Sequence, residues 1–236
     1  LENRARIHLE IIKKCREEVG NDFAISIKLN SADFQKGGFS PEDSIQVAKL
    51  FSDSGIDNIE ISGGTYEQPR LLGLDKVSIN PKRSENRKES TIAREAYFLS
   101  YAEEIAKVVN IPLMVTGGFR TKEGMEAALR DGACEIVGVG RPLCANPYAI
   151  KELLSGQIDE LPKYEKTLSI GPWWLSPTSP FRLIQAINAF SAQAWFYQQI
   201  KKMGKGLMPD LNLKPWKAFR EDAKADQEAI KEYQKI

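Results

Sequence analysis

The segment 111–143 constrains the fold most strongly, because it reads as a strand, a glycine loop, a helix, a second strand and a second glycine loop. Ile111–Thr116 is an apolar run of strand length, and Thr121 is a good N-cap for the helix that follows. Glu135–Val139 is a second buried-looking strand. Two strands joined through a helix are parallel neighbours in a right-handed unit, so this segment predicts part of a parallel α/β sheet.

Each of these two strands runs directly into glycine. Gly117 and Gly118 follow the first strand, and Gly140 and Arg141 follow the second. The carboxyl ends of parallel strands meet at one edge of the sheet, so backbone N–H groups, a helix N-terminus and one guanidinium should gather there. This combination predicts an anion site, with phosphate as the best candidate; the alternative is tight turns beside a surface arginine.

The rest of the first 155 residues repeats the same alternation of strand and helix. The series has no glycine fingerprint after its first strand, which disfavours a doubly wound sheet, and its glycine loops follow the last two strands, as in a (βα)₈ barrel. Only four βα units are present, so the sequence predicts α/β structure, the second half of a TIM barrel. The remaining strands are expected at 23–29 and 56–62, the helices at 3–19, 41–54 and 91–109, and a long irregular stretch at about 63–90.

A helical C-terminal extension is predicted beyond the half-barrel, with the division at residues 1–158 and 159–236. Prolines and tryptophans near 172–180 lead into a helix over 181–203 and a charged terminal helix over 215–236. The longer helix carries an apolar stripe that we expect to pack on the barrel or on a second subunit. The stripe consists of Leu183, Ile187, Phe190, Ala194 and Tyr197.

Composition limits the kinds of function. The chain has 33 basic and 32 acidic residues for a net charge of +1, so we expect no nucleic-acid partner, and no apolar run is long enough to predict a membrane span. His8 is the single histidine, which argues against a zinc site or a histidine triad, and we predict no metal site. Cys15, Cys134 and Cys144 have no C-x-x-C spacing, and Cys134 and Cys144 are expected to be core thiols in a cytoplasmic protein.

Five sequence motifs occur in a fixed order over residues 1–143. As a set they resemble the Old Yellow Enzyme family of FMN-dependent NADH:flavin oxidoreductases and ene-reductases. The motifs are LENRAR (1–6), ISIKLNSADFQKGGFS (25–40), IEISGGTYE (59–67), VTGGF (115–119) and VGVGRPL (137–143).

The resemblance implies roles for five residues in binding FMN. Lys28 matches the family's cation beside flavin N1 and O2, although a lysine lying along the end of its strand is the simpler alternative. Gly117 and Gly118 match the loop whose N–H groups hold the phosphate, and Gly140 and Arg141 match the pair that completes that site. Separately, Asp33, in the polar loop that follows the first strand, could border the substrate cleft or simply cap that loop.

The resemblance also implies a reaction in which hydride passes from NADH or NADPH through FMN to an activated alkene or quinone-like small molecule. The family's substrate-binding histidine pair and its proton-donating tyrosine match no residue here, so we assign no catalytic residue and expect the chain alone to be incomplete for catalysis. The alternative is a catalytically inactive half-barrel acting as a binding or assembly module. Because a half-barrel leaves two strand edges and an open apolar face, we expect a homo-oligomer or a companion chain to cover them.

Overall fold

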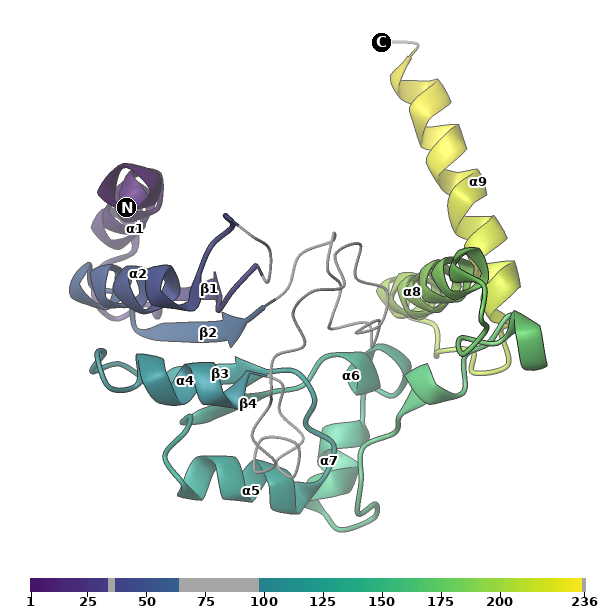
Figure 1. The fold of residues 1–236 in the computed structure, drawn as a ribbon, viewed down its shortest axis with the longest axis horizontal. Helices are drawn as coiled ribbons and strands as arrows, with labels where there is room; N and C mark the ends of the chain where they lie inside the picture. Colours follow the sequence, from purple (N-terminus) through teal and green to yellow (C-terminus); the bar gives the residue numbers. More distant parts are fainter. Residues whose placement is uncertain (34–36, 64–97, 235–236) are drawn as a thin grey trace. The chain divides into compact units, whose positions relative to one another are not determined.

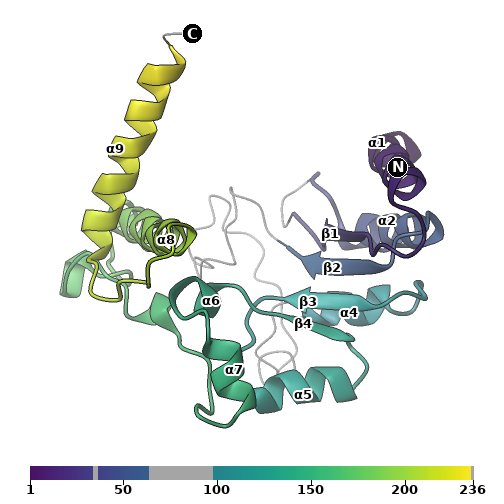
Figure 2. The ribbon, with the colours of Figure 1, turned by 180° about the vertical axis from the view of Figure 1, so that it is seen from behind.

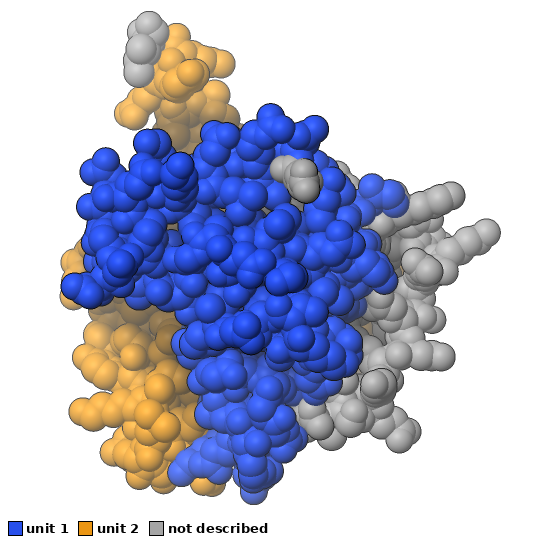
Figure 3. All heavy atoms as spheres, turned by 90° about the vertical axis from the view of Figure 1, so that its left-hand side faces the viewer, with its two compact units in different colours: residues 1–139 blue, residues 140–236 orange. Residues whose placement is uncertain are grey.

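The computed structural model describes residues 1–33, 37–63 and 98–234, and these form an α/β protein. The described chain divides into two compact units, residues 1–139 and 140–236 (Figure 3). The predicted division at residue 158 stays a prediction. Each unit is described by itself below.

Unit 1 is a parallel sheet built from four consecutive strands in the order β1-β2-β3-β4 (Figure 1). All three neighbouring pairs are parallel, and the order follows the sequence without reversal. This is the strand order of a barrel rather than of a doubly wound sheet, and it confirms the predicted fold. The elements are α1 (Glu2–Val19), β1 (Ser26–Asn30), α2 (Pro41–Asp53), β2 (Asn58–Ser62), α4 (Leu99–Ile105), β3 (Leu113–Thr116), α5 (Lys122–Arg130) and β4 (Ile136–Gly138).

Helix boundaries follow from local capping chemistry where the sequence supplies it. The Ser40 hydroxyl accepts a hydrogen bond from Asp43 N at 3.1 Å, with Pro41 in the first turn of α2. Thr121 caps α5 in the same way through Gly124 N, also at 3.1 Å. Within the part of the predicted helix 91–109 that the structure describes, from residue 98 on, α4 spans Leu99–Ile105, so the helix ends four residues earlier than predicted. Residues 91–97 and, apart from Gly63, the predicted irregular stretch 63–90 lie outside the described residues.

One face of the sheet is packed against α1, α2, α4 and α5, which Figures 1 and 2 show from opposite sides. Alternate strand residues point into this core and are buried. They are Leu29 on β1, Ile59 and Ile61 on β2, and Leu113 and Val115 on β3.

The other face of the sheet, which we call the concave face, carries the intervening residues. On β1 and β2 these are all polar: Ser26, Lys28, Asn30, Asn58, Glu60 and Ser62. Only Met114 and Ile136 on β3 and β4 are large and apolar, and Ile136 is 42% exposed. The expectation of an open apolar face is therefore wrong for β1 and β2, because every second residue of those strands is hydrophilic.

Arg16 connects the amino end of this sheet to α1. Its guanidinium donates to the carbonyl oxygens of Gly20 and Phe23 at 2.8 Å, to Gly55 O at 2.8 Å, and to Asp57 Oδ2 at 2.5 Å. One largely buried cation thus holds the loops that precede β1 and β2.

Unit 2 is helical. Its two long helices pack on each other, with Lys201 Nζ on α8 lying 2.6 Å from Asp222 Oδ1 on α9. The elements are α6 (Arg141–Ala145), α7 (Ala149–Leu154), the 3₁₀ turns η2 (Tyr164–Lys166) and η3 (Trp173–Leu175), α8 (Arg182–Gly204) and α9 (Pro215–Tyr233). The sequence did not predict α6, because Arg141-Pro142 reads as the continuation of a loop.

The buried face of α8 shares only Ala194, which is 3% exposed, with the apolar stripe predicted from the sequence. Leu183, Phe190 and Tyr197 are 71%, 60% and 45% exposed, whereas Asn188 and Gln199 are buried. The buried amides are satisfied by backbone from outside the helix. Asn188 accepts from Ile170 N and donates to Leu175 O, and Gln199 both donates to Asp210 O and accepts from Asp210 N. The inward face of α8 therefore combines these amides with the buried side chains of Ala194 and Trp195.

No helix among the described residues combines the length and hydropathy needed to cross a membrane. The same residues contain no group of three or more histidine, cysteine or acidic side chains placed to hold a metal ion.

Candidate functional site

The carboxyl ends of the four strands lie at one edge of the sheet in unit 1. Asn30 pairs with Ser62 and Thr116 pairs with Gly138, so neighbouring strands end level with each other. Parallel α/β folds bind their ligands at this edge, because the loops and backbone N–H groups that follow the strands gather there.

Gly117 and Gly118 form the turn directly after β3. Their φ angles are 124° and 93°, in the region that favours glycine, so the turn itself requires these residues. Neither N–H group donates a backbone hydrogen bond to another described residue. Successive N–H groups in such a turn can bind an anion.

Thr116, the last residue of β3, adds a hydroxyl to the same place. Its Oγ1 is buried and has no hydrogen-bond partner among the described residues. Gly138 lies opposite, and a Cβ there would overlap this oxygen. A buried hydroxyl without a partner is rare in folded proteins, and a ligand-binding role is one explanation for it. The sequence reading did not single out Thr116, although it belongs to the VTGGF motif.

The end of β1 also carries buried polar atoms that have no hydrogen-bond partner among the described residues. Asn30 Oδ1 and Ser31 Oγ are buried and unpartnered within the described part of the chain. Ser31 is completely buried and faces Gly63, where a Cβ would come within 2.7 Å of Ser31 Oγ. Within the described residues, buried polar atoms without a hydrogen-bond partner thus lie at the carboxyl ends of two strands, β1 and β3.

Asp33 braces the loop after β1. Its Oδ1 accepts from Asn30 Nδ2 at 2.6 Å, and its Oδ2 accepts from Phe39 N at 2.8 Å. Asp33 N also donates to Phe39 O at 3.0 Å. With both carboxylate oxygens used inside the loop, Asp33 fits the loop-capping alternative better than a place on a substrate cleft.

Lys28 lies in the middle of β1 rather than at its end. Its Nζ is 2.6 Å from Glu60 Oε1 on β2, and the Lys28 side chain is 57% exposed. The sequence reading missed Glu60, because its relation to Lys28 depends on the register of two strands that are far apart in the chain.

A buried cation follows the glycine turn. Arg120 is only 6% exposed, and its Nη1 donates to Phe119 O at 2.7 Å. No sequence signal marks this arginine as buried, because arginine is usually a surface residue.

Gly140 and Arg141 belong to unit 2. Gly140 has φ −114°, and no described atom lies within 4 Å of a Cβ built on it, so neither its backbone nor its packing requires glycine. Arg141 Nη1 lies 3.9 Å from Glu165 Oε1, and both side chains are about three-quarters buried at 22% and 24% exposure. Gly140 follows the last residue of β4 by two positions in the chain; how it meets Gly117 and Gly118 stays a prediction.

Neither Cys134 nor Cys144 has the lowered thiol pKa that is typical of a redox-active cysteine. Cys134 is buried, and desolvation raises the pKa of its thiol to about 11, so it stays protonated at neutral pH. Burial also raises the pKa of the Cys144 thiol, which contacts Gly140 O at 3.6 Å.

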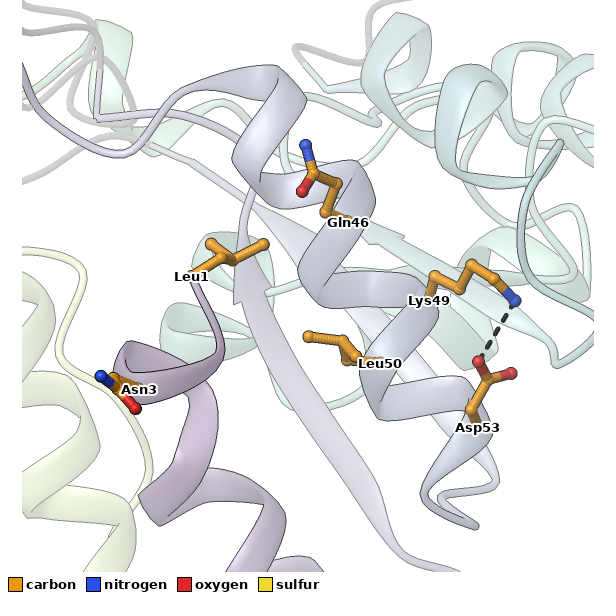
Figure 4. A pocket seen from close by; sticks show the side chains of 6 residues that line it. All are labelled: Leu1, Asn3, Gln46, Lys49, Leu50 and Asp53. Atoms are coloured by element: carbon orange, nitrogen blue, oxygen red, sulfur yellow. Dashed lines mark hydrogen bonds and ion pairs between the residues drawn. The ribbon is translucent and has the colours of Figure 1, made fainter.

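A cavity of about 560 Å³ lies between the start of α1 and α2 (Figure 4). Its one ion pair joins Lys49 and Asp53 at 3.1 Å, within a single helix. None of the predicted site residues lines it, and it belongs to the helical layer rather than to the carboxyl edge of the sheet. The lining residues are Leu1, Asn3, Gln46, Lys49, Leu50 and Asp53.

Comparison with known families decides the relationship. A sequence model of the NADH:flavin oxidoreductase / NADH oxidase family matches residues 1–160, which include both glycine loops and Lys28. The chain belongs to this family. FMN is the cofactor of the NADH:flavin oxidoreductases, with NADH or NADPH as reductant.

Individual relatives agree with this family. The chain is 32% identical over 207 residues to the NADH-dependent flavin oxidoreductase iccE of Talaromyces variabilis, covering 86% of this chain and 47% of that protein. It is 39% identical over 158 residues to iliE of Hypocrea jecorina, covering 65% of this chain and 36% of that protein. The chain thus spans less than half the length of these curated relatives.

A solved structure supports the fold of the same region. A complex of 2-naphthoyl-CoA reductase with 2-naphthoyl-CoA matches with a TM-score of 0.54 and 28% identity, over 68% of this chain and 23% of that one.

At the end of β3, the N–H groups of Gly117 and Gly118 and the buried Thr116 hydroxyl have no hydrogen-bond acceptor or donor among the described residues. Because all three can donate a hydrogen bond to an oxyanion, this donor set fits a phosphate.

Proposed function

We propose that this chain is part of an FMN-dependent oxidoreductase that passes hydride from NADH or NADPH to an activated alkene. The chain would supply the residues that bind the FMN phosphate and a cation beside the flavin ring. The observation that carries the proposal is the carboxyl end of β3. There a buried, unpartnered Thr116 hydroxyl adjoins two glycines with positive φ in a family that binds FMN.

The phosphate would be held by residues of both glycine loops. Gly117 and Gly118 would donate their N–H groups, and Arg141 would add a charge-assisted hydrogen bond. Gly140 supports this arrangement indirectly. Because neither backbone conformation nor packing requires glycine there, close approach of a ligand to the backbone is a reason for it.

Lys28 would act at the other end of the cofactor. FMN, when bound, accepts and donates hydride, and its reduction adds negative charge to the pyrimidine part of the ring. An ammonium fixed near that charge would stabilise it, as preorganised cations do in active sites. The exposure of Lys28 on the concave face leaves its Nζ available for this contact.

The substrate would be a small alkene or quinone-like molecule. The histidine pair that binds the substrate carbonyl in the family and the tyrosine that donates the proton match no residue of this chain. The proton donor would therefore lie outside residues 1–236. We further propose that a companion chain or a second copy covers the edges of β1 and β4, since unpaired strand edges invite association.

The proposal is tested by comparing FMN with riboflavin, which lacks the phosphate. We expect the protein that carries this chain to bind FMN at least about tenfold more tightly than riboflavin, measured by quenching of flavin fluorescence. Arg141→Gln should weaken FMN binding about tenfold and leave riboflavin binding unchanged, since a charge-assisted hydrogen bond contributes about 1.5–3 kcal/mol. Gly140→Ala should also weaken binding of FMN alone, because its methyl group would keep the phosphate away from the backbone.

Gly204→Ala is the matched control, because Gly204 also has no described atom within 4 Å of a Cβ built on it and lies at the end of α8, away from the glycine loops in the sequence. Equal affinity for FMN and riboflavin would refute the proposed phosphate-binding site. So would a loss of both ligands in Gly140→Ala with an unchanged melting temperature.

A further inference from the structure

The pair formed by Lys28 and Glu60 joins the middle of two neighbouring strands. The two residues are directly opposite in the parallel register of β1 and β2, and their charged atoms are 2.6 Å apart. Both lie on the concave face, since Ile59 and Ile61 on either side of Glu60 point into the core and are completely buried.

The two partners differ in their contact with water. The Glu60 side chain is 19% exposed, whereas the Lys28 side chain is 57% exposed. Next to this pair, Ser26 Oγ donates to Asn58 Oδ1 at 2.8 Å, which fixes the preceding pair of the ladder. The Glu60 carboxylate is therefore largely enclosed by protein, whereas the Lys28 ammonium is exposed enough to contact a ligand.

Stability does not explain this pair. Ion pairs with an exposed partner contribute about 0–1 kcal/mol, because water screens them and the lysine loses side-chain freedom. A cation and an anion in the middle of adjacent strands, on the face where we place the flavin, are better explained by electrostatic control of that cofactor.

We propose that Glu60 is a positioning residue that holds the Lys28 ammonium and partly neutralises it, which lowers the reduction potential of the bound flavin. This inference rests on the proposed contact between Lys28 and FMN. A cation beside the flavin favours the reduced state, because reduction adds negative charge. A carboxylate 2.6 Å from that cation opposes the effect, so the protein keeps a stronger hydride donor than Lys28 alone would give.

The test is the midpoint potential of the FMN-loaded protein, measured by equilibration with redox dyes at low salt. Glu60→Gln keeps the size of the side chain and removes its charge. We expect it to shift the two-electron equilibrium about tenfold toward reduced flavin, which corresponds to about +30 mV. Lys28→Met should shift the equilibrium by a similar factor in the opposite direction.

Two further variants separate charge from shape. Glu60→Asp keeps the negative charge and should leave the shift at less than half of that seen with Glu60→Gln. Glu104→Gln removes a carboxylate on α4 that lies 2.6 Å from Lys107 Nζ, just past the end of that helix, and should leave the potential unchanged. Melting temperatures of all four variants check that each is folded.

The outcomes distinguish this inference from the proposed function. If Lys28→Met lowers the potential but Glu60→Gln leaves it unchanged or lowers it, the role of Glu60 is refuted and that of Lys28 stands. If Lys28→Met leaves the potential unchanged, the contact between Lys28 and FMN fails, and this inference fails with it. An equal rise in Glu60→Gln and Glu104→Gln would also refute it, since the effect would then reflect net charge.

Discussion

Replacing Gly138 by alanine should destabilise unit 1, because a side chain at this position of β4 would collide with two side chains of β3. A Cβ at position 138 would overlap Thr116 Oγ1 and lie 2.8 Å from both Thr116 Cβ and Met114 Cε. Ordinary van der Waals contact begins at 3.4 Å. The Met114 methyl can rotate away, but Thr116 Cβ is fixed to its backbone, so the ends of the two strands must separate.

The expected cost is about 3 kcal/mol, at the upper end for adding a methyl group to a packed interior. Rotation of the Thr116 hydroxyl alone cannot relieve the contact, because the Cβ distance remains too short. Urea denaturation followed by circular dichroism measures this change. It should lower the unfolding midpoint without changing the slope.

A second substitution tests the stated cause. Thr116→Gly removes both offending atoms, so the double variant Gly138→Ala, Thr116→Gly should be about 2 kcal/mol more stable than the sum of the two single effects predicts. Gly140→Ala is the control, since no described atom lies within 4 Å of its Cβ, and it should fall within about 0.5 kcal/mol of the wild type. A Gly138→Ala protein as stable as the wild type, or a double variant without this coupling, would refute the described contact.

Two other predictions concern charge and burial. The pKa of Asp57 is held below its ordinary value of 3.8 by the Ile25 N–H and then by Arg16, so its ionised form stabilises the fold above about pH 4 and that stability is lost as pH falls through the lowered pKa. Asp57→Asn should therefore lose less stability than the wild type between about pH 5 and pH 2, as followed by urea midpoints; parallel curves would contradict this. Trp195 is 1% exposed and donates to Leu213 O at 2.9 Å, so Trp195→Phe should destabilise unit 2 by about 2 kcal/mol in thermal unfolding, and an unchanged melting temperature would count against the described packing.

The elements of unit 1 could be predicted from sequence because their signals are local. Ser40 and Thr121 precede α2 and α5, and residues of these types at such positions predict a helix start from sequence alone. In the structure each accepts a hydrogen bond from the N–H group three positions later. Alternating strands and helices then fix parallel pairing. The short helix α6 carried no such signal, since its first residues also suit a loop.

The orientation of α8 could not be predicted, because it depends on distant partners. Apolar spacing favoured the side of Leu183 and Phe190, yet the buried side carries Trp195 together with Asn188 and Gln199. The two amides form hydrogen bonds with backbone at positions 170, 175 and 210. A buried amide is favourable only when such partners exist, and the sequence does not reveal them.

Some residues of the candidate site could be predicted from sequence and others could not. Gly117 and Gly118 could be placed from sequence, because they end a recognisable strand, and their positive φ angles account for glycine there. Glu60 and Thr116 could not, because their importance comes from the strand register that puts Glu60 opposite Lys28 and from the burial of the Thr116 hydroxyl.

The most direct test of the central claim is a crystal structure of the protein that carries this chain, grown with FMN. We expect the FMN phosphate within hydrogen-bonding distance of the Gly117 and Gly118 N–H groups and of Arg141, with the pyrimidine part of the ring beside Lys28. A phosphate bound away from the end of β3, or a flavin whose ring lies far from Lys28, would contradict it.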